Sequence, residues 1–362
     1  ADVIGQEVAV QTLTNAFISK TMHSCYILGG NRGSGKTSSA RILAAMENCK
    51  EGPTLDPCGK CENCISIFNG KSLDIREIDA ASNRGIDDIR ALQEEIRYAP
   101  VSGRIKYIII DEVHSLTGQA AEAALKMIEE PPSHVRFILA TTDPHLIIDT
   151  IHSRCIMLKF YKVAWNDIFN HLKKICELEK IEYENDALRV IAKSANGSVR
   201  DALQHLQAVV NYTANKKITL LSTTESLGVI NQTSYFEFID HIIKADAPAA
   251  FQTIEGLLND GKDCGEVSNG LYGHLRNLML CRTCRKHLDK FDFTEDEAKK
   301  YLYQAQNIKL EFVLFMMSNM LKVNEGISLN LDPQTLLEKL AVEAIVFNKT
   351  QQVVVKEHVN TA

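Results

Sequence analysis

The chain has 362 residues, of which 45% are hydrophobic and 24% are charged, and its formal net charge is −6. That length predicts about two or three domains. The negative charge excludes a protein that coats DNA through its whole surface, so any nucleic acid must meet a local patch or a lumen built by several subunits. No apolar run approaches the ~20 residues that cross a bilayer, so we expect no membrane partner. No secretory signal is visible.

Residues 25–160 alternate short apolar runs with longer helical patterns. The continuous apolar character of the short runs predicts parallel strands that are buried on both faces. Their alternation with helices predicts a doubly wound α/β domain over residues 1–162. Expected helices include 37–46, 87–97 and 120–130. The expected strands are 25–30, 73–79, 107–112, 136–142 and 156–160.

After about residue 162 the strand-like runs stop and apolar residues recur at helical spacing. We expect a small helical domain over 163–227, in which Leu188 and Ile191 share an apolar face, and an all-helical domain over 228–362. In the last domain Ile239 and Ile242 share an apolar face. This domain as a whole has more apolar helical faces than a small appended domain needs to bury internally. This excess predicts a collar that joins subunits.

A phosphate-binding loop is predicted at residues 30–37, which read GNRGSGKT and fit the pattern G-x-x-x-x-G-K-[ST] between a strand and a helix. Glycines let backbone N–H groups point at phosphates, and the following helix aims its positive end at them. We expect Lys36 to reach the β- and γ-phosphates and Thr37 to hold Mg²⁺. A glycine-rich turn without a ligand is the alternative, and the flanking strand and helix disfavour it. The residues expected to bind ATP are Gly30, Gly33, Ser34, Gly35, Lys36, Thr37 and Ser38.

The second half of a nucleotide site is predicted in the stretch IIIDEVH at 108–114. Asp111 ends an apolar strand, so its carboxylate is expected beside the phosphate loop, where it would position Mg²⁺. Glu112 is a candidate to orient and polarise the attacking water, with a solvated acid at a strand end as the alternative. We leave His114 out of the chemistry, because a histidine in this position more often packs locally.

Four cysteines, Cys49, Cys58, Cys61 and Cys64, stand at spacings of eight, two and two intervening residues. Four thiolates make a complete tetrahedral shell for a structural zinc ion, and no histidine or carboxylate suggests an open catalytic position. An iron–sulfur centre is the rival, but its ferredoxin pattern continues with x3-C-P, which is not found here. We therefore expect Zn²⁺ to fasten an insertion over 49–64 to the outside of the α/β domain, as a knob that faces a partner.

The other six cysteines lie in apolar or helical contexts, which favours a reducing cytoplasm and one metal site over a disulfide framework. Cys281 and Cys284 could share a helix face with His287, but packing is the more common role of such a pair. These six residues are Cys25, Cys155, Cys176, Cys264, Cys281 and Cys284.

The chain resembles a known family from residue 2 to about residue 210, and more weakly in the helical remainder. This family is the bacterial DNA polymerase III gamma/tau subunit, the AAA+ motor of the sliding-clamp loader. The resemblance implies an AAA+ ATPase domain with a zinc module, a helical lid and a collar. The stretch AAMENC before the first cysteine departs from the family's usual sequence. The segments that carry the resemblance are GNRGSGKTSSARILA, EIDAASNRGIDDIR, IIIDEVHSLT, ALKMIEEPPSHVRFILATTDP, IHSRC and GSVRDAL.

The resemblance also implies roles for three residues that spacing alone does not identify. Thr142 matches the sensor-1 position, beside the phosphate loop. Arg154, in SRC, matches the arginine finger that reaches the neighbouring subunit's ATP site, and Arg200 matches sensor 2, which contacts the nucleotide of its own subunit. An ion pair at a strand edge and a helix-surface charge are the alternatives for Arg154 and Arg200. An arginine supplied by a neighbour would make hydrolysis depend on assembly.

A DNA contact is predicted before the helix at 87–97. Its N-terminal N–H groups could take a phosphate, and the family's corresponding helices line a spiral that tracks the duplex backbone. An ordinary helix cap is the alternative. The residues expected to contact DNA are Ser82, Asn83, Arg84 and Arg90.

Together these features predict the ATP-driven motor of a clamp loader, with ATP, Mg²⁺ and Zn²⁺ as cofactors. The expected partners are delta-like and delta-prime-like subunits, the sliding clamp and primer–template DNA, in a pentameric ring. The rivals are another AAA+ remodeller, such as a Holliday-junction motor or a helicase loader, a non-hydrolysing scaffold subunit, and a P-loop kinase. The cysteine insertion disfavours the first rival, and the intact Lys36, Asp111 and Glu112 disfavour the second. No acceptor-binding motif supports the third.

Overall fold

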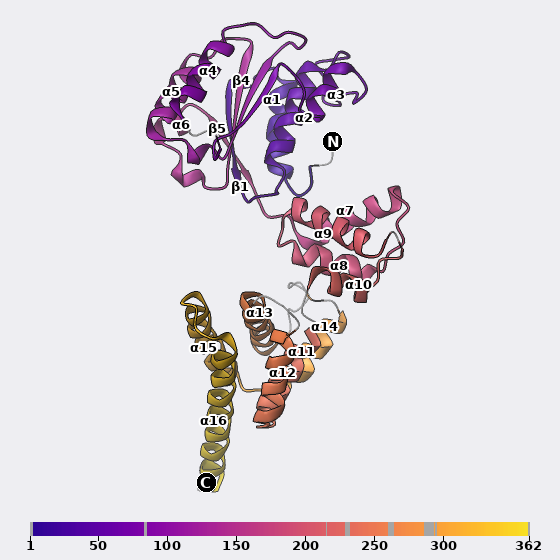
Figure 1. The fold of residues 1–362 in the computed structure, drawn as a ribbon, viewed down its shortest axis with the longest axis vertical. Coiled ribbons are helices and arrows are strands. Elements are labelled where there is room, and N and C mark those ends of the chain that lie inside the picture. Colours follow the sequence, from indigo (N-terminus) through magenta and orange to yellow (C-terminus); the bar gives the residue numbers. More distant parts are fainter. Residues whose placement is uncertain are drawn as a thin grey trace. The chain divides into compact units, whose positions relative to one another are not determined.

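The computed structural model describes residues 3–82, 85–214, 216–228, 232–259, 264–285, 293 and 295–360. The chain divides into two compact units, residues 1–227 and 228–362. The first unit contains a sheet and the helices around it, followed by a helical bundle (Figure 1). The second unit is all helical in its described part.

The sheet of the first unit has five parallel strands in the order β2-β3-β4-β1-β5. The central strands are almost entirely buried, as their continuous apolar sequences predict, whereas the edge strands β2 and β5 keep partly exposed faces. The prediction of a parallel α/β domain is therefore confirmed. The strands span Cys25–Gly30 (β1), Ile75–Asp79 (β2), Lys106–Asp111 (β3), Val135–Thr141 (β4) and Ile156–Phe160 (β5).

Helices cover both faces of the sheet (Figure 1). Alternate side chains of β3 point to opposite faces: Ile108 and Ile110 pack toward α4, α5 and α6, and Tyr107 and Ile109 pack toward α1, α2 and α3. The helices are Glu7–Ile18 (α1), Lys36–Asn48 (α2), Glu62–Phe68 (α3), Ile86–Glu95 (α4), Gly118–Glu129 (α5) and Asp149–His152 (α6), with short 3-10 turns at Val113–Ser115 (η1) and Pro144–Leu146 (η2).

Four helices follow the sheet within the first unit. Their core contains Leu188 and Ile191, as the periodicity predicts, together with Ile168 and Leu172 from the preceding helix. These helices are Trp165–Leu178 (α7), Asn185–Ser194 (α8), Val199–Tyr212 (α9) and Leu220–Leu227 (α10).

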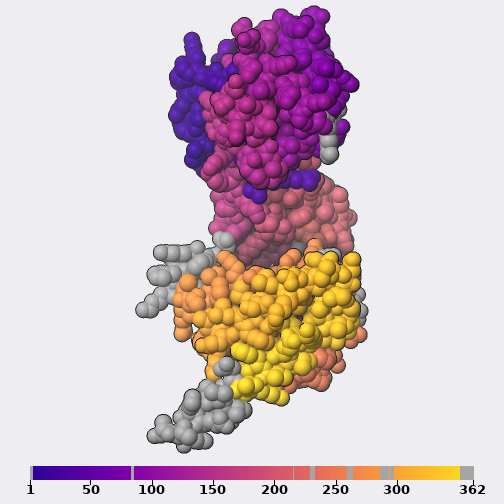
Figure 2. Space-filling view, turned by 90° about the vertical axis from the view of Figure 1, so that its left-hand side faces the viewer, coloured from indigo at the N-terminus to yellow at the C-terminus, as the bar shows by residue number. Residues whose placement is uncertain are grey.

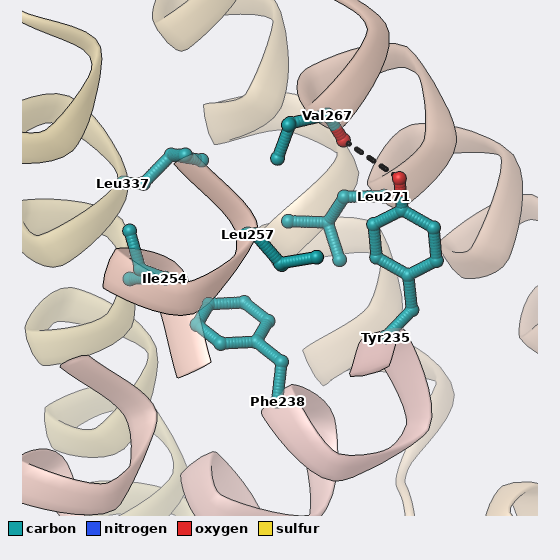
Figure 3. A pocket seen from close by; sticks show the side chains of 7 residues that line it. All are labelled: Tyr235, Phe238, Ile254, Leu257, Val267, Leu271 and Leu337. Atoms are coloured by element: carbon teal, nitrogen blue, oxygen red, sulfur yellow. Dashed lines mark hydrogen bonds between the residues drawn. The ribbon is translucent and has the colours of Figure 1, made fainter. Parts of the chain in front are cut away.

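The second unit has its own apolar core, in which Ile239 and Ile242 are fully buried as predicted. A small pocket in this core is lined by apolar side chains and Tyr235, whose hydroxyl donates to the carbonyl of Val267 at 3.4 Å (Figure 3). Of the helices that the structure describes, none is both long and apolar enough to span a membrane. The helices are Gln232–Ile243 (α11), Ala247–Asn259 (α12), Cys264–Thr283 (α13), Glu295–Gln306 (α14), Leu310–Ser328 (α15) and Pro333–Asn360 (α16).

The scattered cysteines differ from the expectation in one pair, because Cys25 and Cys155 form a disulfide. They are 130 positions apart in the sequence. Strands β1 and β5 pair in parallel with Tyr26 opposite Ile156, so the residues just before this pair also face each other. The pairing follows from strand register, which the spacing of the cysteines does not reveal. Cys281 is buried, as packing predicts, and burial raises the pKa of its thiol to about 11. His287 lies outside the described residues.

Candidate nucleotide site and metal centre

The loop between β1 and α2 has glycine where a side chain would clash or where the backbone lies in the left-handed region, which favours glycine. A Cβ at Gly30 would lie 1.9 Å from the carbonyl oxygen of Phe160. Gly33 and Gly35 have φ angles of +71° and +97° in the left-handed region, and Gly35 is the N-cap of α2. The loop therefore has the shape that the glycine pattern predicts for a phosphate cradle at a helix N-terminus.

Lys36 is buried at the first position of α2, and its ammonium group bridges the loop. Nζ donates to the carbonyl oxygens of Gly30 at 2.7 Å and of Asn31 at 3.0 Å. Burial lowers the pKa of Lys36, and the carboxylates of Glu112, Asp111 and Asp143 oppose this shift. A phosphate bound in the glycine loop can replace the two carbonyl oxygens as the acceptor of the Lys36 ammonium group. Ser34 is also buried and donates to the Asn31 carbonyl, whereas Ser38 is exposed.

Thr37 and Asp111 meet although 74 positions separate them. The Thr37 hydroxyl donates to Asp111 Oδ2 at 2.9 Å. Asp111 is the last residue of β3, and Thr37 lies in the first turn of α2. One hydroxyl and one carboxylate beside a phosphate cradle are the oxygen ligands that Mg²⁺ takes in such sites, so the pair fits this ion.

Glu112 and Thr142 are also brought together, from the ends of β3 and β4. Glu112 has a φ of +50° in the left-handed region, which is uncommon for this residue type. Glu112 Oε2 accepts from the backbone N–H of Thr142 at 3.2 Å and from its hydroxyl at 3.1 Å. This carboxylate is therefore held by Thr142, the residue that is predicted to be sensor 1.

His114, which we leave out of the chemistry, packs beside the same cluster. Its Nδ1 lies 2.8 Å from Thr141 Oγ1 and 3.4 Å from Glu112 Oε2. The short η1 turn after β3 turns the side chain toward the end of β4. The only sequence signal for this contact is that His114 stands two residues after Glu112.

The helical part of the first unit touches the phosphate loop through the start of α9. The N–H of Val199 donates to the Gly33 carbonyl at 3.0 Å. A Cβ at Gly33 would lie 2.0 Å from Ser198 Oγ and 3.2 Å from the Cβ of Arg200. Arg200, at the second position of α9, is thus placed beside the loop with an exposed side chain.

Arg154 is placed elsewhere, in the turn between α6 and β5. Its Nη1 donates to the Thr150 carbonyl at 2.8 Å, and its Nη2 lies 2.8 Å from Glu129 Oε1. The side chain is 40% exposed. The polar contacts of Arg154 among the described residues are with Thr150, Ser153 and Glu129, and none is with the phosphate loop.

The four predicted metal ligands converge at the end of α2 and the start of α3. Their sulfur atoms all lie within 4.8 Å of one another. A tetrahedral zinc shell with Zn–S bonds of about 2.3 Å places sulfurs about 3.8 Å apart, so a small contraction completes it. Among the described residues this is the one cluster of metal-ligating side chains, and it consists of Cys49, Cys58, Cys61 and Cys64.

The thiol pKa values differ within the cysteine cluster. Burial raises the pKa of the Cys61 thiol, but hydrogen bonds from the N–H groups of Lys50 and Cys64 outweigh it and lower this pKa to about 6. Burial raises the pKa of Cys64 to about 12. Thiolates are the ligands that Zn²⁺ takes from cysteine, so a bound cation would favour the ionised form of all four side chains.

The predicted DNA-contacting residues are described only in part, because Asn83 and Arg84 lie outside the described residues. Ser82 is exposed, and its hydroxyl donates to Asp79 Oδ2 at 2.7 Å. Arg90 pairs with Asp87 at 3.4 Å on the exposed face of α4. Acidic side chains in the first turn of α4 already complement its positive end, which weakens the argument for a phosphate there.

Three family models match consecutive parts of the chain. The model described as DNA polymerase III, delta subunit, matches residues 5–164. The model of the DNA polymerase III clamp loader subunit, ATPase lid domain, matches residues 167–211. The model of DNA polymerase III subunits gamma and tau domain III matches residues 218–350.

Individual relatives of the chain are gamma and tau subunits of DNA polymerase III. The DNA polymerase III subunit gamma of Buchnera aphidicola subsp. Schizaphis graminum is 41% identical over 300 residues, or 82% of each chain. The subunit tau of Bacillus subtilis is 37% identical over 78% of this chain and 50% of its own length. The chain thus spans only about half of that relative.

Among solved structures, the Thermotoga maritima RuvB Holliday junction branch migration motor aligns with a TM-score of 0.47 and 19% identity, over 66% of this chain and 76% of its own. The Bacillus subtilis DNA clamp loader delta protein aligns with a TM-score of 0.41 and 14% identity, over 93% and 99%. The relationship therefore rests on the sequence relatives and the family models. On their combined match, the chain belongs to the gamma/tau family of AAA+ ATPase subunits of the DNA polymerase III clamp loader.

Proposed function

We propose that this chain is the ATP-driven motor of a sliding-clamp loader, which hydrolyses ATP between subunits to place a clamp on primer–template DNA. One observation carries the proposal. The Thr37 hydroxyl meets the Asp111 carboxylate at 2.9 Å, next to a buried lysine that spans a glycine loop. An inactive scaffold has no need for this combination, because burying the Lys36 cation lowers stability unless a ligand uses it.

Each residue of the cluster has a proposed role. Lys36 neutralises the β- and γ-phosphates, and Thr37 and Asp111 would hold Mg²⁺. Glu112 orients the attacking water, and Thr142 positions Glu112 through the two hydrogen bonds described above. The loop residues Gly30, Gly33, Ser34, Gly35 and Ser38 line the phosphates.

The two arginines supply positive charge in different ways. Arg200 lies beside its own phosphate loop, which supports a contact with the nucleotide of the same subunit. Arg154 is exposed and turned to another part of the surface, which supports a contact with a neighbour's nucleotide. A loose phosphoryl-transfer transition state gains from added positive charge, so hydrolysis would wait for assembly.

Each of the three predicted domains has its own proposed role. Residues 1–162 form the ATPase domain, 163–227 the lid that carries Arg200, and 228–362 the collar. We propose a pentameric ring with delta-like and delta-prime-like subunits in the cytoplasm, with the clamp and DNA as partners. Ser82, Asn83, Arg84 and Arg90 are proposed to face the DNA backbone, without base preference.

The cysteine cluster is proposed to hold a structural Zn²⁺ and not to take part in hydrolysis. All four positions of the tetrahedral shell are filled by cysteine, so no place is left for substrate. The ion would fasten the end of α2 to α3, and α3 packs on the ATPase core through the buried Ile67.

The test of nucleotide binding is the variant Lys36→Ala in the full chain. Loss of a charged hydrogen bond predicts roughly 10- to 100-fold weaker binding of ATP, measured by titration with a fluorescent ATP analogue. Lys71→Ala, an exposed lysine far along the sequence from the loop, is the control and should bind normally. Equal affinity for the ATP analogue in the unmodified chain, Lys36→Ala and Lys71→Ala would contradict the proposed site.

A further inference from the structure

We infer that Glu129 is a positioning residue for Arg154: it holds the guanidinium group in the orientation that the neighbouring subunit's ATP site meets. This inference rests on the proposed role of Arg154 and extends it to a second residue. Glu129 is the last residue of α5, and Arg154 lies in the turn after α6, so two separate elements form the contact.

The contacts hold the guanidinium from two sides. Glu129 Oε1 lies 2.8 Å from Nη2. On the other side, the Thr150 carbonyl accepts from Nη1 at 2.8 Å, and Ser153 Oγ lies 3.3 Å from the same nitrogen. Because an arginine side chain ends in a rigid planar fork, contacts at two nitrogens fix both its position and its plane.

The contacts leave donors free for a ligand. A guanidinium has five N–H donors. Hydrogen bonds to Thr150 and Ser153 use the two on Nη1, and Glu129 pairs with Nη2 as an ion pair. Among the contacts of the described residues, one N–H on Nη2 and the N–H on Nε have no acceptor. Two N–H groups are what a bidentate contact with a phosphate needs. Glu129 therefore orients Arg154 without using up its capacity to bind.

The ion pair contributes to orientation and hardly to the stability of the fold. The side chains of Arg154 and Glu129 are 40% and 38% exposed. Ion pairs with such exposure contribute only about 0–1 kcal/mol to stability, because water screens them. A catalytic group that is poorly oriented, in contrast, loses a large part of its effect on the rate. A role in positioning therefore predicts an effect on kcat that is out of proportion to the effect on folding.

The chain offers a matched control at the next position. Glu130 is a second exposed glutamate at the end of α5, and it makes no ion pair among the residues that the structure describes. Glu129→Gln and Glu130→Gln remove the same charge from nearly the same place. A difference between these variants therefore reports the contact with Arg154 and not the local electrostatic potential.

The experiment measures ATP hydrolysis at saturating ATP by the assembled loader, with clamp and primed DNA. Glu129→Gln should lower kcat about 10-fold, with little change in KM, in ATP binding by the isolated chain, or in the thermal midpoint. Glu129→Asp should recover part of the rate, and Glu130→Gln should be normal. In the double variant Glu129→Gln with Arg154→Ala, the rate should equal that of Arg154→Ala alone.

Several results would overturn the inference. A normal or raised rate for Glu129→Gln, while Arg154→Ala is slow, contradicts the positioning role and leaves the proposed function intact. Equal losses for Glu129→Gln and Glu130→Gln, or additive losses in the double variant, also contradict it. A normal rate for Arg154→Ala contradicts the role of Arg154 itself, and the inference fails with it.

Discussion

His274, in the core of the second unit, shows how one buried polar side chain sets a dependence on pH. The ring is 2% exposed and lies 2.9 Å from Gln304 Oε1 and 3.1 Å from the Tyr301 hydroxyl. Burial lowers the pKa of His274 to about 4, against the opposing effect of the hydrogen bond that Gln304 Oε1 accepts from the ring. The unfolded chain binds a proton near pH 6.5, while the folded chain stays neutral.

This histidine should therefore destabilise the unit as the pH falls from about 6.5 toward 4, by up to about 3 kcal/mol in the free energy of unfolding. Above pH 6.5 the contribution of His274 to stability is fully present. The measurement is denaturant unfolding of the full chain at pH 7.5 and 5.0, compared with His274→Gln. The variant should lose less stability on acidification, and an identical loss in both proteins would contradict this account.

The residue scale also shows what sequence can predict of the site. The glycine pattern locates Lys36 and Thr37, because backbone conformation at the loop requires glycine at fixed spacing. Arg154 and Arg200 are predicted only through the resemblance to a family. His114 is expected to pack outside the chemistry, and only its partner Thr141 is not predicted. Glu129 is missed, because its contact with Arg154 joins separate elements, and sequence spacing contains no such information.

At the scale of elements, strands are predicted best where they are buried on both faces. The expected runs at 25–30 and 156–160 coincide with β1 and β5, and β2 begins two residues later than expected, at Ile75. The continuous apolar pattern predicts more burial for the edge strands β2 and β5 than the structure shows. The sequence does not reveal which strands lie at the edges of the sheet. Helix α1 was not predicted, although Ala9 and Leu13 of this helix pack against the sheet.

The predicted zinc module is attached to the ATPase domain by specific polar contacts. Arg104, in the loop before β3, donates to the carbonyl oxygens of Cys49 at 2.7 Å and Glu47 at 3.1 Å. Asn63 of α3 donates to the Asn48 carbonyl at 2.9 Å and the Ser102 carbonyl at 3.1 Å. The cysteine cluster is thus fixed to the end of α2 by polar contacts that do not depend on a bound ion.

Purified protein should contain about one zinc per chain and no iron. Cys61→Ser should reduce the metal content to near zero and lower the thermal midpoint of the ATPase domain, because binding of the ion contributes to folding. Metal analysis and thermal unfolding measure both effects, and Cys284→Ser is the control with normal metal content. A brown protein that absorbs visible light and contains iron would contradict the zinc assignment.

At the scale of the whole molecule, the second unit has an apolar surface that supports a role in assembly. Leu314 and Leu321 of α15 and Val346 of α16 are 47%, 54% and 57% exposed. The rings of Phe315 and Phe347 stack with centroids 4.3 Å apart, next in sequence to Leu314 and Val346. Helices α15 and α16 cover much of one face of this unit (Figure 2).

The double variant Leu314→Glu with Leu321→Glu should therefore weaken assembly of the full chain, because charges would have to be buried in the collar. Sedimentation velocity, with and without the partner subunits, should show a shift to smaller species at an unchanged thermal midpoint. Leu178→Glu, which changes a leucine outside the second unit that is 71% exposed, is the control. An assembly mass equal to that of the unmodified chain would contradict a collar at this surface.

The most direct test of hydrolysis between subunits is a mixture of two inactive variants, Arg154→Ala and Glu112→Gln. Arg154→Ala alone should reduce hydrolysis by the assembled loader on the order of 10³-fold, and Glu112→Gln alone should abolish it. In mixed assemblies, an intact Arg154 from one chain meets an intact Glu112 from its neighbour. The account predicts that ATP hydrolysis returns on mixing, in proportion to the number of such interfaces. Mixed assemblies of normal mass that bind ATP but recover no hydrolysis would contradict it.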